Sequence, residues 1–473
     1  MGICGAAKRH SIRPMGTGLA ARNGGRVGLA ALVAILLLGA GLRVGEAWDG
    51  RAPVYDAAAY AAIAANLEHG EGFTVGAGAT QPSSNYSPGL PLFVAGLYEA
   101  TGGVHERLAR VALALIGSLA ILFAYLIARR LRRSMHFGCQ GHQNASSAVA
   151  GLIAAAAVAI YPALLEYQGM LMSEPLAATL LSGAVLAMLW AGDAGDERPG
   201  RTRWLLPGAL LGALALVRPE YLGVALLLGL VVIAKGFRDD RRRSLAQAAI
   251  LLAGVIVVVA PWTIRNAVAL DRFVPISTGG GQVLFAGTYL PSDGDPEQVG
   301  AEVVARHPAL FSPNALQDLR LEQILARLAT HRYPDLETDR ALSRMGREQL
   351  WEDVSEKPLE FTGFVAAKVG RVWSHGPREV MREPGWEALH WALVGFGLLG
   401  LLVLAWRRRW EALVLATTFL SITALSALLV ASPRRVLVMA PLVAALAGVG
   451  ATWLWDLGTK ASRDRRTERP ASP

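Results

Sequence analysis

The stretch Val54-Tyr55-Asp56-Ala57-Ala58-Ala59-Tyr60 follows an apolar segment at about 27–47 and places an acid just beyond it. From Asp56 to about Gly70, apolar residues recur at helical spacing, which predicts a short helix with one apolar stripe. A carboxylate here would lie where membrane meets water, so its role bears directly on what the protein does. The stripe consists of Ala57, Tyr60, Ala61, Ala64 and Leu67.

The composition is that of a membrane protein. Of the 473 residues, 53% are hydrophobic and 18% are charged, and the mean hydropathy is +0.36. Soluble domains carry about 25% charged residues, and several apolar runs here approach the roughly 20 residues that cross a bilayer. The formal net charge of +9 arises from short basic runs between apolar segments. We therefore expect the lipid bilayer, and no nucleic acid, as a partner.

Basic clusters give the order of the crossings, because positive residues gather on the cytosolic side of polytopic membrane proteins. If every cluster is cytosolic, each consecutive pair encloses an even number of crossings. The clusters are Lys8 to Arg26, Arg129 to Arg133, Arg198 to Arg203, Lys235 to Arg243, Arg407 to Arg409 and Arg463 to Arg469. The count predicts crossings at about 27–47, 107–128, 148–165, 171–191, 204–217, 221–235, 248–264, 387–406, 411–430 and 436–456.

The expected fold class is therefore all-α: a polytopic membrane protein with about ten transmembrane helices, interfacial helices in its first external loop and a helical external region. Both ends of the chain are expected in the cytosol. The regions are a basic N-terminus (1–26), a seven-span catalytic module (27–264) with an external loop (48–106), an external helical region (265–385), C-terminal transmembrane helices (386–456) and a cytosolic tail (457–473).

The apolar stretch Pro88 to Gly103 does not fit this count. If it crossed the membrane, the basic cluster Arg129 to Arg133 would lie outside, against the bias of such residues. The stretch is also short and is interrupted by Pro91 and Gly96. We expect it to form an interfacial helix on the outer leaflet, paired with the Asp56–Gly70 helix.

Charged residues at membrane spans are costly and therefore mark candidate sites. Four arginines at the expected outer ends depart from the cytosolic placement of the other basic residues. A guanidinium matches phosphate oxygens and stays charged, so these arginines predict a lipid-phosphate site. Headgroup contacts or salt bridges to Glu166, Glu174 and Glu220 are the alternative. The charged residues at the outer ends are Asp56, Glu166, Glu174, Arg218, Glu220, Arg265, Arg434 and Arg435.

Two of the acids are candidate catalytic groups. A sugar acceptor's hydroxyl loses a proton as it attacks the anomeric carbon, and a positioned carboxylate can take that proton. Asp56 and Glu174 are the candidates for this role. The alternative for Asp56 is an N-cap of the helix that follows, and Glu174 can simply be a helix-start charge. Glu166 is a weaker candidate, since an exposed turn also explains it.

The sequence does not require a cofactor. Its histidines show no paired metal-ligand spacing, and it contains no Walker loop, HExxH or GxSxG motif. Asp293, Asp295 and Glu297 can form a cation site, although a solvated acidic turn is the simpler expectation, so a divalent cation is left open. Cys4 and Cys139 fall in segments expected to be cytosolic, where thiols stay reduced.

The order of these features resembles the C-type (GT-C), multi-span glycosyltransferases that use polyprenyl-phosphate sugars, such as protein O-mannosyltransferases and the aminoarabinose transferase of lipid A. The resemblance covers about residues 27–290, and the C-terminal part by topology only. The chain departs from the family at Asp56-Ala57, where Asp-Glu is common, and at Glu174, where many relatives have Asp. The matching motifs are Tyr55-Asp56 with Tyr60, Tyr86-Ser87-Pro88-Gly89-Leu90-Pro91-Leu92, Met172-Ser173-Glu174-Pro175-Leu176 and Pro261-Trp262-Thr263-Ile264-Arg265-Asn266.

The resemblance implies a glycosyltransferase of the cell membrane with its active site on the extracytoplasmic face. The donor would be a polyprenyl-phosphate sugar, and the acceptor a lipid, a glycan or a protein. Asp56 and Glu174 would be catalytic, Arg218, Arg265, Arg434 and Arg435 would bind the donor phosphate, and Tyr60, Glu166 and Glu220 would support them. A transporter or lipid flippase, and an inert membrane scaffold, are the alternatives.

Overall fold

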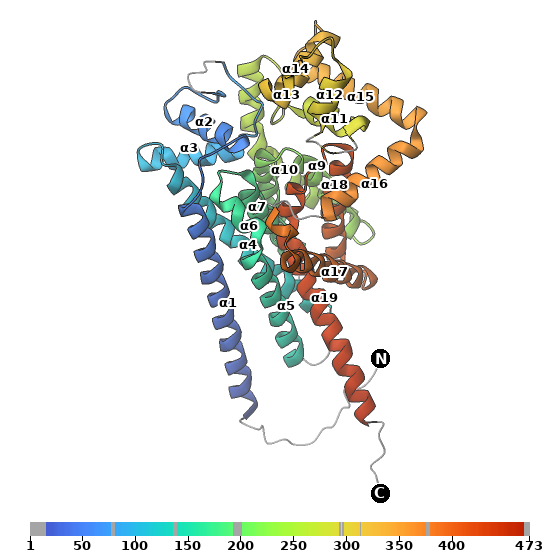
Figure 1. Ribbon diagram of the computed structural model, residues 1–473. Helices are drawn as coiled ribbons and strands as arrows, with labels where there is room; N and C mark the ends of the chain where they lie inside the picture. Colours follow the sequence, from blue (N-terminus) through green and yellow to red (C-terminus); the bar gives the residue numbers. More distant parts are fainter. Residues whose placement is uncertain are drawn as a thin grey trace.

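The computed structural model describes residues 16–76, 81–135, 140–192, 201–292, 295, 298–312, 314–374 and 379–467, and within these ranges the regular secondary structure is entirely helical. Long helices form a bundle, and a cap of shorter helices covers one end of it (Figure 1). The all-α, polytopic fold class is confirmed. Cys4, Cys139, Asp293 and Glu297, which the sequence analysis considered, lie outside the described residues.

Within the described residues, seven helices are long and apolar enough to cross a membrane. A bent pair, α5 (Gln140–Ile160) with α6 (Pro162–Glu166) and the short η1 (Tyr167–Gly169), forms an eighth candidate, with an angle of 53° at the break. The seven are α1 (Gly16–Trp48), α4 (Glu106–Ser134), α7 (Ser173–Gly192), α10 (Arg241–Leu270), α17 (Pro384–Trp406), α18 (Trp410–Leu428) and α19 (Arg434–Thr467).

The remaining two expected crossings are shorter helices. α8 (Leu205–Val217), which follows η2 (Arg201–Trp204), has 13 residues, and α9 (Tyr221–Gly236) has 16. At 1.5 Å per residue they span about 20 and 24 Å, less than the roughly 30 Å of the hydrocarbon core. The expected ten apolar segments are all helical, but only seven or eight have the length of a crossing.

A buried arginine stabilises the bend between α5 and α6. Pro162 has no N–H, so it cannot satisfy the carbonyl of Val158 one turn earlier. The Arg43 guanidinium from α1 donates to the Val158 carbonyl oxygen at 2.7 Å and to the Ala159 carbonyl oxygen at 3.1 Å. Arg43 is 1% exposed. A buried, charged side chain is unfavourable within the membrane, and here its N–H groups pair with the backbone carbonyls that the break in the helix leaves without a partner.

Two helices of the loop at 48–106, which the sequence analysis expects to be external, lie side by side above the end of α1 (Figure 1). They are α2 (Asp56–Glu68) and α3 (Gly89–Thr101), and α3 also packs against α4 and α8. With 13 residues, α3 is not among the helices long enough to cross, as expected for an interfacial helix. The expected apolar stripe of α2 is buried at Ala57, Tyr60, Ala61 and Ala64, and Leu67 is partly buried.

The region from Gly280 to Arg382, called the external region after its expected side of the membrane, has a small core of its own. Phe285, Leu325, Leu328 and Leu342 are buried in it. In Figure 1, α11 to α15 lie at the top of the molecule, and α16 leads down from them. They are α11 (Gly280–Thr288), η3 (Leu290–Ser292), α12 (Val299–Arg306), α13 (Ala315–Asp318), α14 (Leu321–Arg332), α15 (Thr338–Glu356), α16 (Pro358–Ser374) and η4 (Glu379–Arg382).

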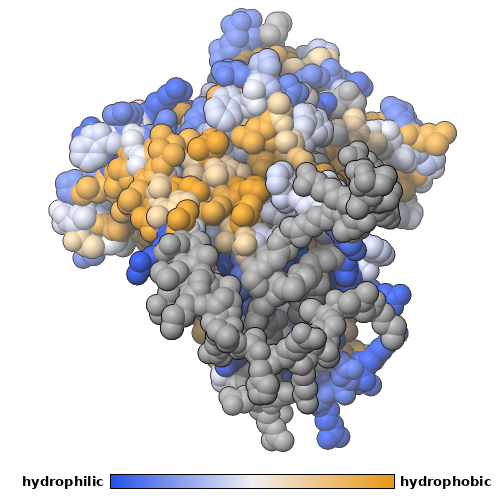
Figure 2. Space-filling model, turned by 90° about the horizontal axis from the view of Figure 1, so that it is seen from below, coloured by the Kyte–Doolittle hydropathy of each residue, from blue (hydrophilic) through white to orange (hydrophobic). Residues whose placement is uncertain are grey.

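The bundle exposes apolar side chains where lipid would contact it. Seen from below, hydrophobic residues form a broad area with hydrophilic residues at its edge (Figure 2). Exposed leucines such as Leu37 on α1 and Leu420 on α18 are typical of this surface. The last helix, α19, is longer than expected. It continues to Thr467, beyond the predicted end of the last crossing at about 456.

Candidate active site

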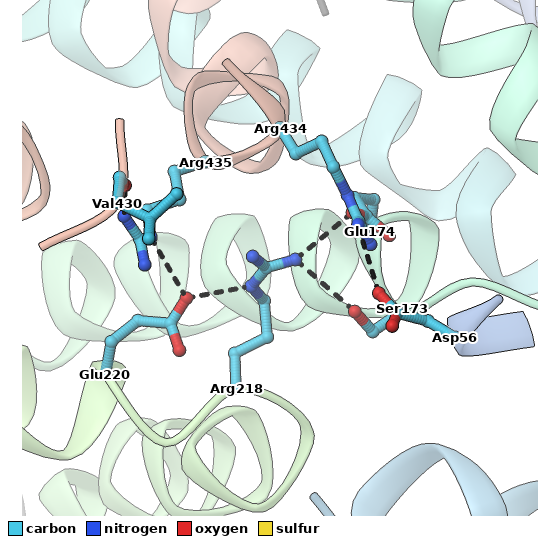
Figure 3. A network of polar contacts seen from close by, with 8 residues as sticks. All are labelled: Asp56, Ser173, Glu174, Arg218, Glu220, Val430, Arg434 and Arg435. Carbon is cyan, nitrogen blue, oxygen red and sulfur yellow. Dashed lines mark hydrogen bonds and ion pairs between the residues drawn. The ribbon is translucent and has the colours of Figure 1, made fainter. Parts of the chain in front are cut away.

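Charged side chains from four segments that are distant in the sequence meet at one place in the structure (Figure 3). Each segment is the end of a helix or the turn between two helices, so the charged side chains lie at one end of the helices and not along their length. The residues are Asp56 at the start of α2, Glu174 in the first turn of α7, Arg218 and Glu220 between α8 and α9, and Arg434 and Arg435 at the start of α19.

Prolines fix the backbone beside two of these residues. A proline disfavours helical backbone at the residue before it. Arg218, which precedes Pro219, has an extended conformation (φ −143°, ψ 100°) and ends α8. Pro175 lies in the first turn of α7, where the missing N–H costs no helical hydrogen bond. Glu174 is therefore held at the helix start, where a carboxylate is favoured by the helix dipole.

Arg434 joins the two candidate catalytic acids. Its Nε donates to Glu174 Oε1 at 2.5 Å, and its Nη1 donates to Asp56 Oδ2 at 3.1 Å, across 378 residues of sequence. One guanidinium thus bridges the first external helix and α7. Its side chain remains 32% exposed, so part of the guanidinium stays accessible from outside the network.

The two acids differ sharply in their exposure. The Glu174 side chain is 0% exposed, whereas that of Asp56 is 43% exposed. Glu174 Oε1 also lies 3.4 Å from Arg218 Nη1, while Glu174 Oε2 is buried and has no hydrogen-bond partner among the described residues. Only Asp56 is accessible to a substrate. Glu174 is placed to hold two arginines.

A second ion-pair group extends the network toward α9. Arg218 Nε donates to Glu220 Oε1 at 3.0 Å, and Arg218 Nη1 donates to Ser173 Oγ at 3.3 Å. Arg435 Nε lies 3.8 Å from the same Glu220 oxygen, and Arg435 also donates to the Val430 carbonyl. Arg218, Glu220 and Arg435 are each less than 20% exposed, so this part of the network is mostly closed.

The network contains three carboxylates and three guanidinium groups, so their formal charges balance. Arg434 and Arg435 both lie at the N-terminal end of α19, where positive charges are opposed by the helix dipole. The neighbouring acids offset this unfavourable placement. A helix N-terminus with two arginines also favours an anion, so a phosphate is a suitable additional ligand.

Asp56 does not cap α2, contrary to the alternative considered from the sequence. Tyr55 is the N-cap residue and has positive φ (50°), and α2 lacks a side-chain cap hydrogen bond. Asp56 is the first helical residue, and its carboxylate instead contacts Arg434. The capping role is therefore wrong, because the side chain is engaged in the network.

Two tyrosines lie near Asp56. The rings of Tyr60 and Tyr86 meet edge to face, with centroids 5.6 Å apart. Burial raises the pKa of Tyr60, and the charges of Asp56 and Glu174 raise it further, so its phenol stays protonated. Burial also raises the pKa of Tyr86, with further contributions from the charges of Asp56 and of Glu322 in α14. The charge of Asp56 thus acts on both tyrosines.

The structure places Arg265 apart from the other three arginines. Its Nη1 donates to the Ser83 carbonyl at 2.9 Å and to Asn266 Oδ1 at 3.0 Å, and its Nη2 donates to the Phe73 carbonyl at 3.3 Å. The guanidinium also lies over the Trp262 ring, 4.9 Å from its centroid. Arg265 therefore fastens the 73–83 loop to α10 and is not part of the network in Figure 3.

Two further expectations concern Glu166 and a metal ion. Glu166 ends α6, is half-buried and is not among the residues of Figure 3. In the described part of the chain, groups of three or more His, Cys, Asp and Glu residues that could hold a metal do not occur. Arg434 contacts one oxygen of each candidate acid, Asp56 Oδ2 and Glu174 Oε1.

The network includes residues that the sequence did not identify. Ser173 falls within a quoted motif and directly precedes Glu174, and a polar residue next to a candidate acid is a usable indication of such a role. The contribution of Val430 is a backbone carbonyl. Its side chain carries no indication of that role, so only the three-dimensional arrangement identifies it.

No protein-family model and no curated protein sequence matches the chain. Solved structures do match. The oligosaccharyltransferase AglB from the archaeon Archaeoglobus fulgidus, in complex with an inhibitory peptide and a dolichol-phosphate, aligns with a TM-score of 0.53 at 17% identity. The alignment covers 94% of this chain and 52% of AglB, and the apo form of the Archaeoglobus fulgidus oligosaccharyltransferase gives the same values.

The chain therefore spans about half the length of the archaeal enzyme that it matches. ArnT from Cupriavidus metallidurans, bound to undecaprenyl phosphate, aligns with a TM-score of 0.41 at 15% identity, over 90% of this chain and 77% of ArnT. At such identities a structural likeness establishes the fold alone. The resemblance to GT-C glycosyltransferases is confirmed at the level of the fold: the chain has the polytopic helical fold of these membrane enzymes.

Proposed function

We propose that the protein is a membrane glycosyltransferase that transfers a sugar from a polyprenyl-phosphate donor to an acceptor on the extracytoplasmic face of the cell membrane. The observation that carries the proposal is the convergence of Asp56, Glu174, Arg218 and Arg434 from four helices into one network. The fold supports it, since the matching archaeal structure is an oligosaccharyltransferase in complex with a dolichol-phosphate.

The arginines would bind the donor phosphate. Arg434 uses its Nε and Nη1 for the two acids and remains 32% exposed, so its outer edge can pair with a phosphate oxygen. Arg218 lies behind it and is held by Glu174 and Glu220. As the sugar departs, negative charge accumulates on the phosphate, and prearranged guanidinium groups stabilise that charge.

Asp56 would act as the base. The acceptor oxygen forms a bond to the anomeric carbon while the bond from that carbon to the phosphate oxygen breaks, and the acceptor proton passes to Asp56. Polyprenyl phosphate leaves with the electron pair of the broken bond, so no separate acid is needed at the leaving group. A phosphate that pairs with Arg434 would also weaken the hold of Arg434 on Asp56 and release the carboxylate for this step.

Glu174 would position the arginines instead of touching the acceptor. Its side chain is fully buried and lies between Arg434 and Arg218. This assignment revises the sequence-based expectation, which treated both acids as catalytic. The proposed mechanism assigns the charge of the leaving group to the arginines and contains no step through the divalent cation that the sequence left open.

The alternatives fit the structure less well. A transporter or flippase would place charged groups near the bilayer midplane between two related halves. Here the charges gather at the ends of α2, α7 and α19, and the sequence shows no internal repeat. An inert scaffold does not explain why Asp56, Glu174 and Arg434 are in contact, although Asp56 and Arg434 are 378 residues apart in the sequence.

A transfer assay tests the proposal. Membranes that contain the protein would be incubated with a panel of labelled polyprenyl-phosphate sugars, alongside membranes that lack it. We expect one donor to label a lipid, glycan or protein acceptor only when the protein is present. If every donor in the panel remains unreacted while its uptake into the membranes is verified, the proposed activity is contradicted.

A further inference from the structure

A long groove lies between α4, α7 and α8. Its volume is about 1080 Å³, and apolar side chains such as Phe123, Leu126 and Leu186 line most of it. Along α4 the apolar wall runs from Ile116 to Leu126, ten residues or about 15 Å. This is about half of the roughly 30 Å hydrocarbon core, so the groove has the depth of one leaflet.

Positive charge gathers where the apolar wall ends. Arg129, Arg130 and Arg133 follow on the last turns of α4, and Arg409 approaches from the segment between α17 and α18. Arg130 donates to the Leu189 carbonyl at 2.5 Å, about 22 Å along α7 from Glu174. The basic end of the groove is thus separated from the candidate active site by most of the bundle.

Two donors at this end have no protein acceptor. The Nε atoms of Arg129 and Arg409 are buried and lack a hydrogen-bond partner among the described residues. The other contacts are Arg129 Nη1 to Tyr125 Oη at 3.3 Å and Arg409 Nη2 to Glu411 Oε1 at 3.0 Å. Buried donors without acceptors are unfavourable, and phosphate oxygens are the acceptors that arginine matches best.

We infer that this groove binds one anionic phospholipid from the leaflet opposite the candidate active site. Its acyl chains would lie along the apolar wall of α4 and α7, and its phosphate would accept hydrogen bonds from Arg129 and Arg409. Glu411 pairs with Arg409 Nη2, while the Nε atoms of Arg129 and Arg409 lack an acceptor among the described residues. The usual cytosolic bias explains arginines in this region, but it does not explain unpaired, buried donors beside a groove.

The isoprenoid tail of the proposed donor is a different occupant. The top of the groove, at Thr179, is about 7.5 Å along α7 from Glu174, so a tail could enter it. An isoprenoid tail carries no charge and offers no acceptor to Arg129 or Arg409. The charge at the far end of the groove therefore favours the phospholipid, and the inference does not depend on sugar transfer.

Native mass spectrometry of the full chain in mild detergent tests the inference. Phosphatidylglycerol and phosphatidylcholine with identical acyl chains would be titrated separately. We expect wild type to retain phosphatidylglycerol about tenfold better and the Arg129→Gln/Arg409→Gln variant to lose that preference. The matched control, Arg238→Gln/Arg242→Gln, removes the same charge from exposed positions near the start of α10 and should keep the preference.

A second variant keeps the test independent of the arginines. Leu119 lines the groove, and Leu119→Trp would fill it while all four arginines remain. We expect this variant also to lose phosphatidylglycerol retention. Equal retention of the two lipids by wild type would overturn the inference. So would retention of polyprenyl phosphate, without phosphatidylglycerol, by wild type and the double arginine variant alike.

Discussion

Arg434 is the residue on which the candidate site depends most. It contacts Asp56 and Glu174 at once, from a helix that begins 378 residues after Asp56. Its two acids differ in exposure, so the same side chain faces a buried partner on one side and an accessible one on the other. We infer that Arg434 both organises the site and presents a charge to the donor.

Replacement of Arg434 by lysine tests this dual role. A lysine keeps the positive charge but cannot hold two carboxylates and a phosphate with a planar fork. In the transfer assay we expect the donor KM of Arg434→Lys to rise at least about tenfold, together with a lower kcat. Arg408→Lys, at an exposed position beyond α17, is the matched control. Wild-type kinetics in Arg434→Lys would exclude Arg434 from donor binding.

Lys368 in α16 gives the external region a dependence on pH. Its side chain is 1% exposed, and its Nζ donates to the Gly287 carbonyl at 2.6 Å. Burial, together with the positive charges of Arg435 and Arg371, lowers the pKa of Lys368 to about 7. In the unfolded chain the group titrates near 10.5. Between these values the unfolded state binds more protons, so this group makes stability rise with pH.

We therefore predict that the midpoint of thermal unfolding in detergent rises from about pH 7 to pH 10 through Lys368, with no further loss from this group below pH 7. Lys368→Met should unfold at a higher temperature at pH 7 and show a flatter profile. The exposed Lys357→Met should keep the wild-type profile. A Lys368→Met profile as steep as that of wild type would contradict the proton linkage.

Single residues also show what the sequence could and could not predict. Asp56, Glu174 and the arginines beside them were identifiable because charges at membrane spans are rare and costly. Arg265 was equally conspicuous, yet backbone carbonyls of Phe73 and Ser83 take its donors. An arginine satisfies a carbonyl and a phosphate with the same N–H groups, so the residue type alone does not distinguish the two partners.

At the scale of the helices, small residues set how closely the membrane segments pack. A Cβ at Gly208 in α8 would lie 2.0 Å from the Leu251 carbonyl oxygen in α10, and one at Gly254 would lie 2.7 Å from the Leu205 carbonyl oxygen. This contact holds α8 against a full-length span. Because α8 leads directly into Arg218, its position determines where that guanidinium lies.

Gly208→Ala tests this packing. The added methyl group must push α8 and α10 apart, which we expect to destabilise the protein by about 1–3 kcal/mol and to lower transfer by displacing Arg218. Gly223→Ala, in α9, has open space around its Cβ position and gains helix propensity. Thermal unfolding in detergent should separate the two variants. A Gly208→Ala midpoint at or above that of Gly223→Ala would show that the close contact is unimportant.

The helices themselves were largely predictable, and their exceptions have physical causes. Apolar length and periodicity identified every membrane segment and the pair α2 and α3. The bend at Pro162 and the burial of Arg43 depend on each other, since the arginine satisfies carbonyls that the break exposes. That pairing joins α1 to α5 across more than one hundred residues, and no local pattern in the sequence encodes it.

At the scale of the whole molecule, the basic clusters predict which side of the membrane carries the site. Labelling of single cysteines tests this prediction. With Cys4 and Cys139 replaced by serine, Ser312→Cys in the external region should react with a membrane-impermeant maleimide in intact cells. Arg238→Cys, before α10, should react only after lysis. The reverse pattern would place the network on the cytosolic side.

The fold follows from the apolar pattern, whereas the site depends on contacts between segments that are hundreds of residues apart. The sequence could show that Asp56, Glu174 and Arg434 share one end of the bundle, because topology orders their helices. It could not show that one guanidinium joins both acids, or that Glu174 is buried and Asp56 exposed. These differences separate the proposed base from the residue that positions the arginines.

The central claim is that Asp56 activates the acceptor. The most direct measurement is the rate of sugar transfer by Asp56→Asn with a saturating polyprenyl-phosphate donor, compared with wild type and with Asp271→Asn. Asp271 is exposed and has positive φ (49°), a conformation that asparagine also accepts, so its variant is a matched control. We predict a loss of at least about 100-fold for Asp56→Asn alone, with thermal unfolding close to that of wild type. Transfer by Asp56→Asn within a few fold of wild type would contradict the account.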